Sequence, residues 1–168
     1  MKKILKKRRR AEGKTDYKAR VAMLKSGKAR VVFRRTNRYI IGQYVKSKEA
    51  ADYVLAGANS KELLDYGWLK TSSGSLKSLP ASYLTGFLLG KKISDKEGEE
   101  GIFDLGLLRN VKKSRAYAFL KGVADAGIKV KANEEIFPDE KRIKGMHMKS
   151  RISEVFEKIK ENINKKFA

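Results

Sequence analysis

The sequence predicts an α/β domain with a mixed central sheet and helices packed on its faces, plus a basic N-terminal extension and a C-terminal helix. Segments rich in β-branched and aromatic residues come before segments of helical periodicity, in the order β-β-β-α-β-α. Residues 146–168 carry apolar side chains along one helical stripe. The first 48 residues hold 18 Lys and Arg against two acids, whereas the remaining 120 hold 22 against 17.

The charge pattern divides the chain into three predicted parts. Residues 1–14 form a basic arm, in which seven of the first ten residues are Lys or Arg. Such blocks repel themselves and stay disordered until a polyanion orders them. Residues 15–145 form the α/β core domain, and residues 146–168 form the C-terminal helix. The core opens with a short helix, which Thr15 or Asp16 caps and Gly27 ends.

The predicted strands follow from β-rich runs between turn residues. Residues 29–46 are expected to form a hairpin with its turn at 36–38. Residues 51–58 give a third strand, which Gly57 weakens. The short apolar run 101–108 is expected to be a buried central strand.

Helices are predicted where apolar residues recur at helical spacing. Ser60 is expected to cap a helical turn that runs through Leu64 and ends near Gly67-Trp68, and Pro80 opens a helix that runs to about Lys92. A second amphipathic helix spans 114–126, and the last helix follows Gly145.

Composition excludes several classes of protein. There are no cysteines, so disulfides and thiolate metal sites are excluded. The N-terminus lacks the apolar core of a secretory signal, and the apolar run from Leu84 to Leu89 is far shorter than the roughly 20 residues of a membrane span. We therefore expect an intracellular soluble protein or a component of a larger assembly.

Two residues are candidates for catalysis or metal binding. His147 is the only histidine, and with no cysteine it cannot complete a zinc site or a triad. Asp104 lies in the apolar strand and would need a second acid to form a two-metal nuclease site. No such partner is evident, Asp52 being the nearest candidate, so we expect Asp104 to be a strand-end or hydrogen-bonded acid. No cofactor and no metal is predicted.

The basic segment requires a polyanionic partner, because its charges would otherwise repel one another. Nucleic acid, an anionic membrane and acidic protein all qualify. A membrane is disfavoured, because the arm offers only Ile4 and Leu5 for insertion. Aromatic residues interleaved with the cations favour RNA, whose unpaired bases stack on such rings. Of these, Phe33 and Tyr44 are expected in the core and Tyr39 is expected to be more open.

Several segments resemble one family of large-subunit ribosomal proteins, the archaeal and eukaryotic branch of the family numbered eighteen, which binds 5S rRNA. The resemblance covers about residues 5–150, and Ala29 stands where the family usually has proline. In order, the matching segments are Thr15-Asp-Tyr-Lys-Ala-Arg, Leu24-Lys-Ser-Gly-Lys-Ala-Arg-Val-Val, Arg35-Thr-Asn-Arg, Tyr66-Gly-Trp, Pro80-Ala-Ser-Tyr-Leu-Thr-Gly-Phe-Leu, Phe103-Asp-Leu-Gly-Leu, Gly122-Val-Ala-Asp-Ala-Gly and Arg142-Ile-Lys-Gly-Met-His.

The resemblance implies a structural, non-enzymatic role in the large subunit of the cytoplasmic ribosome. Its implied partners are 5S rRNA, which it would anchor to the large-subunit rRNA, and neighbouring ribosomal proteins. The residues implied to contact RNA are Arg8, Arg9, Arg10, Lys14, Arg20, Lys25, Lys28, Arg30, Arg34, Arg35, Asn37, Arg38, Tyr39, Lys112, Lys113 and Arg115.

Two points remain open from the sequence alone. We predict that the hairpin tip and the Lys112–Arg115 loop lie on one face of the domain, with Ser114 as a helix N-cap beside its cations. A nonspecific nucleic-acid packaging protein, and an RNA-processing enzyme that uses Asp104, stay as alternatives to the ribosomal role.

Overall fold

The protein is described by a computed structural model that covers residues 7–49, 51–96, 100–148 and 152–167. Its four-stranded sheet has the order β3-β2-β1-β4. Strands β1 (Arg30–Arg35), β2 (Ile40–Lys48) and β3 (Ala51–Asn59) pair antiparallel, whereas β4 (Ile102–Asp104) lies parallel to β1. The mixed sheet, the hairpin and the third strand confirm the prediction from sequence.

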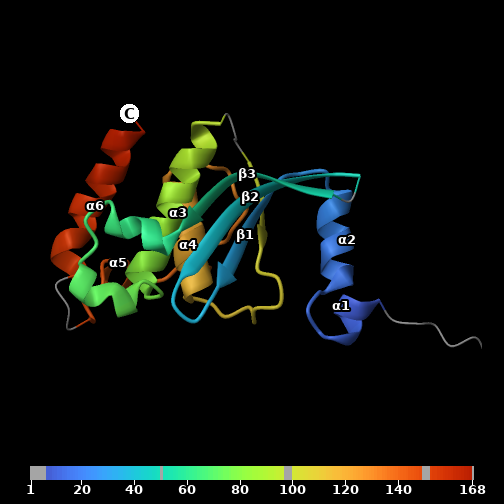
Figure 1. Cartoon of the computed structure of the whole chain (residues 1–168), viewed down its shortest axis with the longest axis horizontal. Coiled ribbons are helices and arrows are strands. Elements are labelled where there is room, and N and C mark those ends of the chain that lie inside the picture. The colour runs from blue at the N-terminus through green and yellow to red at the C-terminus, as the bar shows by residue number, and fades with distance from the viewer. Residues whose placement is uncertain (1–6, 50, 97–99, 149–151, 168) are drawn as a thin grey trace, which may run out of the picture.

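The main helices lie together beside the sheet, while the two N-terminal helices stand apart at the opposite end (Figure 1). Helix α3 (Leu79–Ser94) packs on β2, β3 and α4 (Arg115–Asp125), and α6 (Ile152–Lys166) packs on α3. The helices α1 (Arg8–Ala11) and α2 (Tyr17–Lys25) bury no residue. Residues 1–6 of the predicted arm lie outside the described residues.

The core follows from the alternation of β1. Successive side chains of a strand point to opposite faces, so Val31 and Phe33 join the hydrophobic core, with the rings of Phe33 and Phe119 centred 5.2 Å apart. Arg30 and Arg34 therefore occupy the other face. The stripe predicted for the last helix is confirmed, since Ile152, Phe156, Ile159 and Ile163 are buried in this same core.

The strand near residue 102 differs from the prediction. It has three residues rather than eight and lies at the edge of the sheet, not at its centre. The register explains why: Ile102 to Asp104 pair with Arg30 to Val32, and the chain then turns away at Gly106, whose φ is +62°. Leu107 is consequently 57% exposed.

The helical turn after β3 also corrects a prediction. The cap of η1 (Ser60–Leu64) is Asn59, whose side chain accepts from the Lys61 N–H at 3.0 Å, while the Glu62 carboxylate accepts from the Asn59 N–H. The buried Ser60 hydroxyl instead accepts from the Ile40 N–H at 3.0 Å, which ties the turn to β2.

Four short helices in the described residues were not predicted. One is α1, which lies in the arm that was expected to be disordered without a polyanion. The others are η2 (Lys70–Ser75), η3 (Glu134–Ile136) and α5 (Glu140–Ile143).

The last helix begins at Ile152 and not directly after Gly145, because residues 144–147 form turns. The other predicted boundaries hold within a few residues, with Ser78 accepting from the Ala81 N–H at the start of α3 and Gly127 (φ +102°) ending α4.

Helices α3 and α4 approach each other through glycines, which gives a testable prediction. A Cβ at Gly122 would overlap the backbone oxygen of Tyr83. Overpacking costs about 1–3 kcal/mol, and we expect Gly122→Ala to reach the upper end because backbone cannot yield. A helix propensity gain of about 1 kcal/mol offsets part of this cost. Urea unfolding should therefore show a net loss of about 2 kcal/mol in the free energy of unfolding.

The control is Gly57→Ala in β3, where the nearest atom to a new Cβ is 3.9 Å away. We expect its free energy of unfolding to stay within about 0.5 kcal/mol of the starting protein. Equal losses at both positions would show that the close approach of the two helices is not the cause.

Candidate nucleic-acid interface

Helix α2 presents its cations on a segment that is held to the domain by polar contacts. Asp16 caps it, accepting from the N–H groups of Lys18 at 2.9 Å and Ala19 at 3.1 Å, as one of the two predicted caps. The helix buries no apolar face in this domain, and Val21 is 47% exposed. The apolar side chains of α2 therefore contribute little to holding the helix in place.

A chain of alternating charges links α2 to the sheet. The Arg20 guanidinium donates to the Asp52 carboxylate at 2.8 Å, and Asp52 accepts from Arg30 at 2.7 Å. Arg30 also donates to Asp104 at 3.0 Å, and Asp104 pairs with Arg34 at 3.4 Å. Three arginines and two aspartates thus fix the relation of α2, β1, the start of β3 and the end of β4.

Asp104 is a structural acid. It is 4% exposed, and its Oδ1 accepts from the Gly106 N–H at 2.7 Å in addition to its arginine partners. This confirms the expected hydrogen-bonded role. In the described part of the chain, no group of three or more His, Asp or Glu side chains is placed to hold a metal ion.

Arg30 corrects the set of residues implied to contact RNA. Its side chain is 4% exposed, and its guanidinium is occupied by Asp104, Asp52 and the Ser47 hydroxyl. A phosphate would have to displace two carboxylates from a buried position. We therefore assign Arg30 to holding the sheet edge and not to an RNA contact.

The same chain of charges acts on the pKa of Asp52. Burial alone would raise this pKa, but hydrogen bonds from Ser47, Arg20 and Arg30 outweigh it and lower the pKa from 3.8 to about 2. The unfolded state then binds the proton more tightly, so the stabilisation is complete above the unfolded pKa and is lost as the pH falls toward about 2.

We expect the free energy of unfolding to fall more steeply between about pH 4 and pH 2 in the starting protein than in Asp52→Asn. Carboxyl-carbon NMR titration gives the pKa directly. Arg20→Ala removes one of the three donors, so it should move the pKa of Asp52 upward. A pKa unchanged by Arg20→Ala would contradict the assigned cause.

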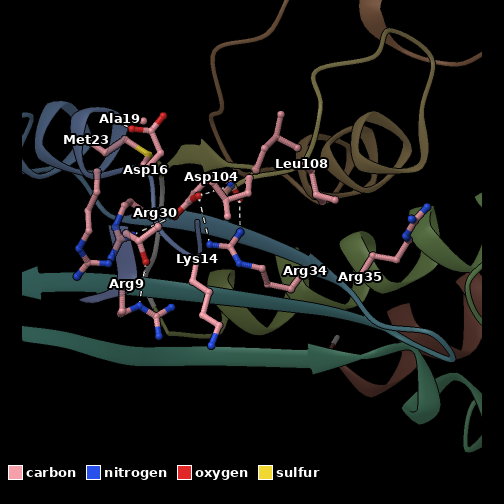
Figure 2. A pocket seen from close by; sticks show the side chains of 15 residues that line it. Arg9, Lys14, Asp16, Ala19, Met23, Arg30, Arg34, Arg35, Asp104 and Leu108 are labelled. Carbon is pink, nitrogen blue, oxygen red and sulfur yellow. Dashed lines mark hydrogen bonds and ion pairs between the residues drawn. The ribbon is translucent and has the colours of Figure 1, made fainter. Parts of the chain in front are cut away.

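A cavity lies beside this network (Figure 2). We call it the α2 cavity. It has a volume of about 400 Å³ and lies between α2, β1 and the loop after β4. Of the residues implied to contact RNA, it is lined by Arg9, Lys14, Arg20, Arg30, Arg34 and Arg35.

Arg34 and Arg35 are adjacent in β1, but their side chains point in different directions and have different neighbours. Figure 2 shows Arg34 turned toward Asp104 and Arg35 pointing away from it. The two-residue period of the strand explains this, because neighbouring side chains leave the sheet on opposite faces. Arg35 also lines a second cavity, together with Lys113 and Arg115.

The second cavity, which we call the α4 groove, has a volume of about 630 Å³. It lies between the end of β1, the starts of α3 and α4, and residues 142–148. Figure 1 shows the β1–β2 turn and the loop that leads to α4 at the same end of the domain. The prediction of a single face is therefore confirmed for Arg35, Lys113 and Arg115.

The start of α4 places its polar groups at this groove. Ser114 occupies the predicted N-cap position, and its side chain makes no capping hydrogen bond. Lys113 has a left-handed backbone, with φ at +56°, and its N–H donates to the Ile136 carbonyl at 2.8 Å. Its ammonium group pairs with Asp139 at 3.0 Å and lowers the pKa of that carboxyl.

The hairpin tip is exposed and held by its backbone. Thr36 and Tyr39 close the turn through hydrogen bonds between their backbones and the Thr36 hydroxyl. Lys77 donates to the backbone carbonyl of Asn37 at 3.0 Å, so this contact does not occupy the Asn37 side chain. Asn37 and Arg38 are both exposed. Tyr39 is half-buried against the core, whereas Phe33 and Tyr44 are buried, so the expectation that Tyr39 is more open than those two is confirmed.

The remaining predicted cations lie outside both cavities. Arg10 and Lys25 flank the outer surface of α2, beside Tyr17. Lys28 pairs with Glu100 at 2.7 Å, and Arg8 approaches Glu12 at 3.8 Å. Lys112 is exposed in the loop before α4.

Sequence reasoning missed three groups that line the α4 groove, namely Arg109, Arg142 and His147. Arg142 and His147 lie in one of the matching segments, so a signal for both was present in the sequence. Nothing in the pattern placed them opposite Arg35, more than 100 residues away in the chain.

Comparison with known proteins identifies the family. A family model described as "Ribosomal large subunit proteins 60S L5, and 50S L18" matches residues 2–103. The chain is 53% identical over 143 residues to the large ribosomal subunit protein uL18 of Korarchaeum cryptofilum, which covers 85% of this chain and 71% of that protein.

Two further relatives carry the same name. The uL18 of Methanothermobacter thermautotrophicus is 43% identical over 84% of this chain and 71% of its own length. The uL18 of Methanoculleus marisnigri is 47% identical over 84% of this chain and 78% of its own length. The chain therefore belongs to the family of the large-subunit ribosomal proteins 60S L5 and 50S L18, which are structural, non-enzymatic components of the large ribosomal subunit.

Proposed function

We propose that this large-subunit ribosomal protein binds 5S rRNA and helps to anchor it to the large-subunit rRNA in the cytoplasmic ribosome. Neighbouring ribosomal proteins complete its proposed partners. The arm of residues 1–14 and the core of residues 15–145 supply the RNA contacts in this proposal, and the C-terminal helix α6 (Ile152–Lys166) supports the core.

One observation carries the proposal: the α2 cavity and the α4 groove share Arg35 and Leu108. Cations from the N-terminal segment, the hairpin and the start of α4 therefore line a continuous surface. A phosphate backbone attracts such a surface without regard to sequence. A folded RNA can span both cavities at once.

The proposed contacts fall into two kinds. Arginine and lysine side chains bind phosphates, which sets position, whereas base edges carry the sequence information. Arg30 is left out because it is buried in ion pairs. The RNA-contacting residues that we propose are Arg8, Arg9, Arg10, Lys14, Arg20, Lys25, Lys28, Arg34, Arg35, Asn37, Arg38, Tyr39, Lys112, Lys113 and Arg115.

The two alternatives from the sequence lose their basis. An RNA-processing enzyme would use Asp104, but two arginines hold this carboxylate. The family to which the chain belongs is also non-enzymatic. A nonspecific packaging role is disfavoured because the chain belongs to a family of large-subunit ribosomal proteins. None of the helices in the described ranges is long and apolar enough to cross a bilayer.

Asn37 and Lys112 provide a matched test of the proposal. Asn37 offers an amide to a base edge, and Lys112 offers only charge. We expect Asn37→Ala to reduce the preference for 5S rRNA over an unrelated structured RNA, by about 1–3 kcal/mol if it reads one base. Lys112→Ala should weaken binding to both RNAs equally. Competition binding at fixed salt measures both effects.

If Asn37→Ala weakens both RNAs equally, the hairpin tip is one more phosphate anchor. If the starting protein binds 5S rRNA no better than the unrelated RNA, the proposed function fails.

A further inference from the structure

The α4 groove combines two kinds of surface that the phosphate contacts alone do not require. Its lining contains a set of cationic side chains, which we call the rim, and a set of apolar side chains, which we call the floor. At about 630 Å³ its volume falls within the range of small-molecule sites. The rim consists of Arg35, Arg109, Lys113, Arg115, Arg142 and His147.

The charge of the rim is largely uncompensated. No Asp or Glu lines the groove, and among its rim residues only Lys113 forms an ion pair within the described parts of the chain. Four of the six groups are arginines, whose planar guanidinium binds phosphate through two hydrogen bonds and stacks on flat rings. The rim is therefore suited to a ligand that carries phosphate beside a flat, conjugated group.

The floor supplies the surface for such a flat group. It is formed by Phe33, Leu79, Leu108, Val111, Ala116 and Met148. Phe33 is buried in the core, but Val111 is 50% exposed and Leu108 is 36% exposed. Leu108 and Val111 therefore lie outside the hydrophobic core and offer exposed aliphatic groups beside the arginines, and Met148 adds a thioether. Pockets that receive an extruded base stack it between apolar or aromatic side chains.

We infer that the α4 groove receives one unstacked nucleotide of the bound RNA, with its base on the apolar floor and its phosphate at the arginine rim. This inference rests on the proposed RNA-binding function and names what one part of that surface binds. An acidic, apolar peptide of a neighbouring protein is the competing occupant. The nucleotide is favoured because Arg35 makes the groove continuous with the cations of the α2 cavity.

Methyl NMR of the full-length protein tests the groove with small probes. AMP, ribose 5-phosphate and inorganic phosphate are titrated separately, and the methyl signals of Val111 and Met148 are followed. We expect AMP to shift both signals in a saturable way, since a stacked base imposes ring-current shifts. Ribose 5-phosphate and phosphate lack an aromatic ring, so they should leave the two signals nearly unmoved.

A pair of variants separates the groove from the rest of the surface. Val111→Glu places a carboxylate in the groove at an exposed position, so the fold is retained. Val54→Glu makes the same change in β3 at a residue of similar exposure, 55%, that lines neither cavity. We expect Val111→Glu to weaken both AMP and 5S rRNA by at least about tenfold, and Val54→Glu to change neither.

Each outcome decides the inference. Unmoved methyl signals with AMP, together with tight 5S rRNA binding that Val111→Glu leaves unchanged, would overturn the nucleotide site and leave the proposed function standing. Methyl shifts caused by a Leu- and Asp-containing peptide but not by AMP would assign the groove to a protein partner and also overturn it. If the starting protein does not bind 5S rRNA, both proposals fall.

Discussion

Asp104→Ala should lower the free energy of unfolding by about 3 kcal/mol, the lower end of the cost of breaking a buried ion pair. The buried Arg30 loses one of its two carboxylate partners and keeps the other, Asp52. Arg30 and Asp104 have side chains only 4% and 5% exposed and are paired at 3.0 Å. The same substitution removes the acceptor of the Gly106 N–H and releases Arg34. Urea unfolding followed by circular dichroism measures the loss.

Glu12→Ala is the matched control. Glu12 also pairs with two cations, Arg8 and Lys14, but all three side chains are well exposed. Exposed pairs contribute about 0–1 kcal/mol each, so this variant should unfold almost as the starting protein does. Equal effects for Asp104→Ala and Glu12→Ala would mean that burial does not strengthen the network.

A double variant separates the ion pair from its surroundings. Replacing both members of a buried pair by apolar side chains is often neutral, whereas removing one member is costly. Asp104→Leu combined with Arg30→Met should therefore lose less stability than Asp104→Ala alone. A larger loss in the double variant would show that the ion pairs of Arg30 with Asp52 and of Asp104 with Arg34 contribute more to stability than the pair between Arg30 and Asp104.

The sequence predicts elements well where a local signal is strong. The hairpin follows from two β-rich runs around a short turn, and α2, α3 and α4 follow from a cap at one end and apolar spacing between. The short helices η3 and α5 have three and four residues, too few for a periodic pattern. The edge position of β4 depends on its pairing with Arg30 to Val32, over 70 residues earlier, and no local pattern records that register.

The interface shows the same division. Residue types predict the chemistry, since a cluster of cations without acids needs a polyanion. Their individual roles depend on distant partners. Arg30, Arg34 and Arg35 share one strand, yet Arg30 is buried between Asp52 and Asp104, Arg34 pairs with Asp104, and Arg35 lines both cavities. Only the fold brings those acids to β1.

Binding to 5S rRNA should be strongly salt-dependent. If about 6–10 phosphates are neutralised, the affinity should fall by a factor of about 10³–10⁵ between about 50 and 200 mM salt, because bound phosphates release their counterions. Deleting residues 1–14 should make the salt dependence shallower. The core should stay folded, because α1 buries no residue.

A charge-matched pair of variants locates the phosphate-binding surface. One carries Arg8, Arg9 and Arg10 changed to Ala, and the other carries Lys141, Lys158 and Lys165 changed to Ala. The first set lies in α1 and the second in α5 and α6, at the opposite end of the domain (Figure 1). Both variants lose three positive charges, so a general electrostatic effect would weaken the RNA binding of both equally.

We expect the logarithmic salt slope to shrink by roughly 0.9 or a little less for each phosphate that the α1 variant no longer neutralises, and to stay constant in the α5–α6 variant. The affinity of the α1 variant at low salt should fall with the number of phosphate contacts that it has lost. Equal slopes in all three proteins would move the phosphate-binding surface away from the N-terminal segment. A reduced slope only in the α5–α6 variant would place the RNA on the opposite end of the domain, since both variants remove the same charge and only its position differs.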